Sequence, residues 1–75
     1  MAKIDTLEAA SRERPGKHRP VSATYHVFEA DGETILQIDT YGSLERQTPG
    51  KITQSIQFGS EGLRSLRAIL DDLGA

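Results

Sequence analysis

The sequence predicts an α+β fold, in which a short antiparallel β-sheet of three to four strands precedes one C-terminal amphipathic helix. Three observations support this prediction. Two runs rich in β-branched and aromatic residues flank an Asp-Gly pair, which is a strong hairpin signal. A third run of alternating apolar and polar residues follows a polar loop. Finally, Leu and Ile recur at helical spacing near the C-terminus.

The hairpin is expected over residues 23–30 (ATYHVFEA) and 34–41 (TILQIDTY), with the Asp-Gly pair at 31–32 in the turn. Because side chains alternate between the two faces of a strand, Leu36 and Ile38 share one face. If that face packs on the helix, the open face of the sheet carries three polar residues of the same strand: Gln37, Asp39 and Tyr41.

The third strand is expected over residues 51–58 (KITQSIQF), where Ile52, Ile56 and Phe58 share one face. Gln54 falls on this apolar face. Its position indicates either a place at the edge of the sheet or a bulge that shifts the register.

The helix is expected to have Ser60 as its N-cap and to end at Gly74. Its apolar residues form one stripe about 120° wide. This stripe packs on the sheet of its own chain or forms the interface of a dimer, and the two arrangements are compatible. The residues concerned are Leu63, Leu66, Ile69, Leu70 and Leu73.

Residues 1–20 are predicted to be a flexible basic N-terminal arm, and residues 21–75 the β-β-β-α domain. The arm carries five basic and three acidic side chains, whereas residues 21–75 carry four basic and eight acidic ones. Ile4 and Leu7 lie one helical turn apart, which is compatible with a short helix over residues 3–10.

The chain of 75 residues allows one domain with a marginal core, and such domains usually need disulfides, a metal or a partner subunit. The sequence has no Cys, and its two His residues are too few for a structural zinc site. Self-association or an unusually well-packed core remains, and we expect a homodimer without metal or cofactor. No apolar segment is long enough for a signal peptide or a membrane span, so a cytoplasmic protein without membrane contact is expected.

We expect no enzymatic activity and assign no catalytic residue. The serines lie outside any nucleophile motif, while His18 falls in the arm and His26 on a strand. The segment Pro49-Gly50-Lys51 superficially resembles a phosphate loop. No helix follows it, however, to supply the stacked N–H groups that bind phosphate.

One group of residues suits single-stranded nucleic acid. A sheet that binds it needs an aromatic ring for base stacking, cations for phosphates and amides for base edges. Tyr41 is the candidate ring, and Arg46 and Lys51 are candidate cations on the adjoining loop. Two amides and two cations of the arm complete the group: Gln37, Gln54, Lys17 and Arg19. The alternative interpretation is a solvated sheet face without a ligand.

The run from Ile35 to Leu70 resembles the positive-cofactor-four-like family of transcriptional coactivators, which are single-stranded-DNA-binding domains. The resemblance rests on strand 36–40, the Pro-Gly-Lys segment at 49–51 with Ile52 after it, Ser60-Glu61 and the apolar helix 63–70. It implies a curved sheet backed by a helix, a homodimer formed through the helices, and strands that grip single-stranded DNA. It also implies that Arg46 and Lys51 contact phosphates and that Tyr41 stacks on a base.

Two functions follow from these patterns. The first is single-stranded nucleic-acid binding by the sheet surface of a homodimer, in transcription or DNA maintenance, with the choice between DNA and RNA open. The alternative is a small protein-interaction or accessory module without nucleic-acid binding, which docks through an exposed strand or the leucine stripe. The acidic charge of residues 21–75 fits this alternative better.

Overall fold

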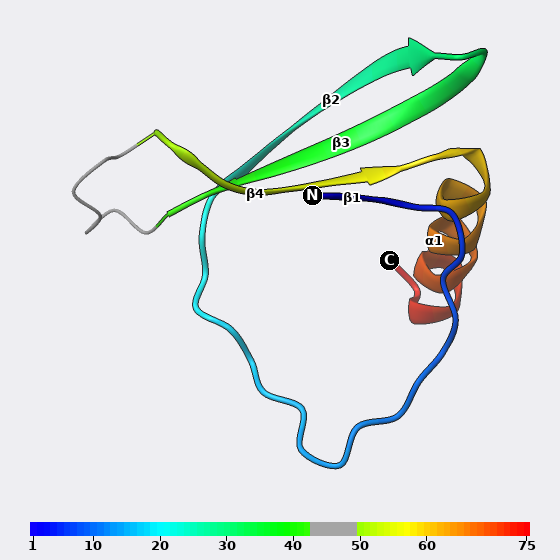
Figure 1. Cartoon of the computed structure of the whole chain (residues 1–75). Coiled ribbons are helices and arrows are strands. Elements are labelled where there is room, and N and C mark those ends of the chain that lie inside the picture. The colour runs from blue at the N-terminus through cyan, green and yellow to red at the C-terminus, as the bar shows by residue number, and fades with distance from the viewer. Residues whose placement is uncertain (43–49) are drawn as a thin grey trace.

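The computed structural model describes residues 1–42 and 50–75, which form a four-stranded sheet followed by one helix (Figure 1). The predicted α+β class with a C-terminal helix is therefore confirmed, whereas dimerisation stays a prediction. The strands lie in the order β1-β4-β3-β2. The elements are β1 (Ala2–Ile4), β2 (Ala23–Ala30), β3 (Glu33–Tyr41), β4 (Ile52–Phe58) and α1 (Ser60–Leu73).

The β2–β3 hairpin is the most regular part of the sheet. Its strands pair antiparallel without a shift from Ala23 opposite Thr40 to Ala30 opposite Glu33. The two turn residues both have positive φ, 52° at Asp31 and 75° at Gly32. This combination is that of a type I′ turn, whose twist matches the twist of the strands. The hairpin predicted from the Asp-Gly pair is confirmed.

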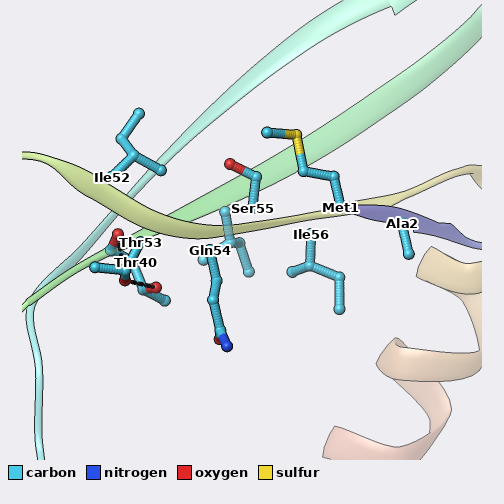
Figure 2. Close-up of a pocket in the computed structure, with 9 residues that line it drawn as sticks. Met1, Ala2, Thr40, Ile52, Thr53, Gln54, Ser55 and Ile56 are labelled. Atoms are coloured by element: carbon cyan, nitrogen blue, oxygen red, sulfur yellow. Dashed lines mark hydrogen bonds between the residues drawn. The ribbon is translucent and has the colours of Figure 1, made fainter.

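A bulge interrupts the antiparallel pairing of β3 with β4. Thr40 lies opposite Gln54, but Tyr41 lies opposite Ile52, so Thr53 is an extra residue. As a result Ile52 points to the opposite side of β4 from Gln54 and Ile56 (Figure 2). The prediction that Ile52 shares a face with Ile56 and Phe58 is thus wrong, and the bulge proposed for Gln54 is the reason.

The first residues of the chain add an edge strand. β1 pairs parallel with β4, from Ala2 beside Ile56 to Ile4 beside Phe58. The sheet is consequently mixed rather than wholly antiparallel. The prediction of a short helix over residues 3–10 is wrong. β1 occupies part of that range, and residues 5–22 contain no helix or strand. The flexibility of the remaining arm stays a prediction.

Helix α1 begins without a side chain from its own N-terminus as cap. The N-cap residue is Gly59, and the N–H of Ser60 donates to Oε2 of Glu33 at 2.9 Å. The prediction that Ser60 caps the helix is therefore wrong, since a carboxylate from β3 takes that role.

Oε1 of Glu33 also pairs with Nζ of Lys3 at 3.1 Å, which connects β1, β3 and α1. The Ser60 N–H and, to a smaller extent, Lys3 lower the pKa of Glu33. The predicted end at Gly74 is confirmed, with φ of 77°.

The sheet has two unlike faces. Directly opposite residues share a face, so Val27, Leu36, Phe58 and Ile4 lie on one side. Phe58 lies against Gly62 of α1 on this side, which we call the helix face. α1 lies under one end of the sheet and leaves the rest of the helix face uncovered (Figure 1). The polar face, on the other side, carries Gln37, Asp39, Ser55 and Gln57.

Few side chains are fully enclosed. Among the described residues, the buried apolar side chains are Ile35 and Phe58, and Asp39 is the buried charged one. In the described part of the chain, no helix has the length and apolar character that a membrane span requires.

Candidate functional site

The polar face carries a connected set of hydrogen bonds across β3 and β4. Nε2 of Gln57 donates to Oε1 of Gln37 at 2.8 Å, and Nε2 of Gln37 donates to Oδ1 of Asp39 at 2.9 Å. The hydroxyl of Ser55 donates to the same Oδ1 at 2.5 Å. These bonds occupy donor and acceptor groups that would otherwise be available to a ligand. Gln37, one of the two amides predicted to read base edges, is therefore already engaged within the sheet.

Asp39 is the electrostatic centre of this network. Hydrogen bonds from Ser55 and then Gln37 lower its pKa, with a smaller contribution from the nearby His26. Its carboxylate is thus ionised at neutral pH, although the side chain is buried. His26 Nδ1 lies 4.0 Å from Asp39 Oδ2, and the imidazole stacks on Phe28 with ring centroids 5.6 Å apart. Sequence reasoning missed this network, although strand alternation had placed Gln37 and Asp39 on one face.

Ser55, Asp39 and His26 do not form a catalytic triad. A triad needs an imidazole between the hydroxyl and the carboxylate, so that the imidazole can accept the hydroxyl proton. Here Asp39 lies between Ser55 and His26. Nor do the described residues bring three or more His, Cys, Asp or Glu side chains together as a metal site.

The predicted nucleic-acid residues do not form one site. Tyr41 lies on the polar face, half-buried, and its hydroxyl lies 3.0 Å from the Thr24 hydroxyl. Gln54 is exposed on the helix face, whereas Gln37 lies on the polar face. Three of the predicted cations are exposed and lie outside the strands. Lys51 directly precedes β4, and Lys17 and Arg19 lie in the arm. Arg46 lies outside the described residues.

A hollow of about 360 Å³ lies where β4 runs on past β1 (Figure 2). Its walls combine the aliphatic side chains of Ile38, Ile52 and Ile56 with hydroxyl and amide groups, and none of the described lining side chains is charged. Acid–base chemistry requires a titratable group within hydrogen-bond reach of the reacting atom. The described side chains of the hollow therefore supply surface contact and no titratable group.

The predicted leucine stripe divides into two parts. Leu63 and Leu66 are half-buried, near the point where α1 contacts β3 and β4. Ile69 and Leu70 are about two-fifths exposed and Leu73 is 74% exposed. The packing of the stripe on its own sheet therefore ends halfway along the helix. The second half presents an apolar surface to solvent.

Comparison with known proteins adds no relative. No protein-family model matches the chain, and neither a curated protein nor a solved structure shows significant similarity to it. The resemblance to the positive-cofactor-four-like family stays a prediction, and the geometry of the chain itself has to carry the functional argument.

Proposed function

We propose that this chain is a small protein-interaction module, and that a protein partner covers the second half of α1. The observation that carries this proposal is the exposed continuation of the helix stripe, formed by Ile69, Leu70 and Leu73. We call these three residues the α1 docking surface. Contiguous exposed apolar patches on a protein surface often mark sites of protein–protein interaction.

The chain exposes more surface than a compact chain of its mass. A compact chain of 8.2 kDa is expected to expose about 4,500 Å². This chain exposes 6695 Å². Residues 5–22, which are exposed except for Leu7, account for part of the excess. Large apolar side chains on the sheet and on α1, such as Val27 and Leu73, also contribute to the exposed area. A standard interface needs about 800 Å² from each partner.

The charges beside the α1 docking surface define the chemistry of the partner. Asp71 and Asp72 lie in the last turn of α1, and that turn contains no basic residue. Both carboxylates add to the partial negative charge that the helix dipole places at its C-terminus. A partner with an apolar stripe flanked by Lys or Arg complements this surface, in the manner of an amphipathic helix.

Nucleic-acid binding is the weaker proposal for this geometry. Its candidate residues lie on both faces of the sheet, and the polar face has the ionised Asp39 at its centre. A phosphate backbone brought to that face would meet a carboxylate rather than a cation.

The proposal is tested by reconstitution. A tagged chain is used to recover a nuclease-resistant, stoichiometric partner, which is then purified separately and titrated with the chain by calorimetry. The double variant Leu70→Ser/Leu73→Ser should weaken binding roughly tenfold or more, as truncation of central apolar residues does. The control Arg64→Ser, on the opposite side of α1, should bind as the original chain does.

A second variant addresses the charges. Asp71→Asn/Asp72→Asn should reduce the salt dependence of binding, because charges at the rim of an interface act mainly on association. Unchanged binding by the Leu70/Leu73 variant would refute the proposal, as would an association that nuclease treatment abolishes.

A further inference from the structure

Strand β2 forms an open edge of the sheet. It is the last strand in the order β1-β4-β3-β2, and no described residue pairs with its outer side (Figure 1). All eight of its residues pair with β3 in a single register. Proteins usually protect such an edge with a bulge, a proline, or inward-pointing or basic charges. The segment ATYHVFEA has no proline, no Lys and no bulge.

The hydrogen bonds of the hairpin show which backbone groups face outward. The N–H of Tyr41 donates to the carbonyl oxygen of Ser22 at 3.0 Å, so Ser22 points toward β3. Every second residue of an antiparallel strand bonds to the same neighbour. The residues between them have N–H and C=O groups that point away from β3 and find no partner in the sheet. They are Ala23, Tyr25, Val27 and Glu29.

The side chains along this edge are also exposed to an unusual degree. Tyr25 is 73% exposed and Val27 is 58% exposed, although both lie on the helix face, beside Ile38 and Leu36. An edge with free backbone groups and two large uncovered side chains has the features of a strand-pairing site.

We infer that two copies of this chain pair through β2, antiparallel, about a two-fold axis at His26. In this register Tyr25 lies opposite Val27 of the second copy, and Ala23 lies opposite Glu29. Every outward N–H and C=O of the four residues then has a partner, which makes about eight hydrogen bonds across the axis. An axis at any other residue leaves at least one of the four without a partner within β2.

The side chains favour a second copy as the occupant. The register puts an aromatic residue opposite a β-branched one on the helix face, a favourable cross-strand pair, at both Tyr25–Val27 contacts. It also keeps the two Glu29 carboxylates apart, since each faces the small Ala23. The contact would cover Tyr25 and Val27, the two large exposed side chains of the edge. The result is a continuous eight-stranded sheet, in which the α1 docking surfaces stay free.

Because the chain has no Cys, a single introduced cysteine tests the register directly. His26 and its copy form a pair without mutual hydrogen bonds, with Cα atoms about 4.5 Å apart, which is within disulfide range. His26→Cys should form a disulfide dimer in a glutathione redox buffer. The matched control Thr24→Cys, on the same face, lies about 13 Å from its own copy in this register and should stay monomeric on a non-reducing gel.

A backbone variant tests the hydrogen bonds. Val27→Pro removes an outward N–H without removing a bond to β3, and proline is tolerated where the N–H faces solvent. Light scattering should give about twice 8.2 kDa for the original chain and for Val27→Thr, but 8.2 kDa for Val27→Pro. Circular dichroism of each variant confirms that the fold is retained.

Three results would overturn the inference. The first is a mass of 8.2 kDa for the original chain at all concentrations up to several hundred micromolar. The second is cross-linking of Thr24→Cys in preference to His26→Cys. The third is a dimer that Val27→Pro leaves intact while Leu73→Cys, on the exposed part of the α1 stripe, cross-links, because the copies would then meet through their helices. The first two results do not bear on partner binding at the α1 docking surface, which is measured separately. The third would place a second copy on that surface.

Discussion

The contact between α1 and β1 makes a sharp prediction at Gly62, which is buried in the first turns of the helix. A Cβ added at this position would overlap the carbonyl oxygen of Ile4 and lie 3.5 Å from Cδ2 of Phe58. The Ile4 oxygen belongs to backbone and cannot turn aside as a side chain could. The substitution Gly62→Ala should therefore push the helix away from β1.

Two opposing effects set the magnitude. In a solvated helix interior, Gly→Ala stabilises a protein by about 1 kcal/mol. Steric overlap in a packed site costs about 1–3 kcal/mol. Displacing the Ile4 oxygen also weakens the hydrogen bond that it accepts from the N–H of Gly59 at 3.3 Å, which contributes about 1 kcal/mol. We expect a net loss of about 1–3 kcal/mol in the free energy of unfolding, from the difference of these terms.

Urea unfolding followed by circular dichroism measures this loss. The control is Gly16→Ala, at a position with no atom within 4 Å of an added Cβ, where the free energy of unfolding should change by less than about 0.5 kcal/mol. If Gly62→Ala raises the free energy of unfolding by the helix-propensity gain of about 1 kcal/mol, α1 does not pack on β1 as described.

Further predictions concern the core, the polar face and nucleic acid. Ile35→Ala should lower the free energy of unfolding by about 2–5 kcal/mol, because Ile35 is buried, whereas the exposed Leu73→Ala should change it little. The lowered pKa values of Asp39 and Glu33 mean that their stabilisation is complete above their ordinary values of 3.8 and 4.5 and is lost as the pH falls through the lowered folded values. Asp39→Asn should therefore flatten the acid side of a plot of melting temperature against pH. A titration of labelled oligo-dT at low salt should be flat, and binding that Lys51→Glu weakens would instead support nucleic-acid recognition.

The parts of the fold that sequence reasoning predicted correctly depend on local patterns. The Asp-Gly turn needs two residues with positive φ, and the sequence provides them at the centre of the hairpin. The end of α1 at Gly74 likewise depends on one residue type at one position. The bulge was open to prediction because a single amide, Gln54, disturbed an otherwise regular alternation.

The parts that were predicted wrongly depend on contacts between distant residues. β1 has three residues, and its partner in β4 lies more than fifty positions along the chain, so no local pattern distinguishes it from a short helix. The cap of α1 comes from Glu33, which precedes Ser60 by 27 residues. A Ser at the start of a helix is a good local candidate, but Glu33 of β3 accepts the N–H of Ser60 itself, and the N-cap position falls on Gly59.

The buried carboxylate also explains why the two proposed surfaces lie away from the polar face. A partner that covered this face would remove the remaining water from around Asp39, and burial of a charge is unfavourable unless new hydrogen bonds compensate for it. Its hydrogen-bond donors within the sheet are already in place, so a partner has little to add. The β2 edge presents unpaired backbone groups, and the second half of α1 presents uncovered apolar side chains. Covering either surface therefore lowers the free energy without covering the Asp39 carboxylate, which is why we assign association to β2 and α1.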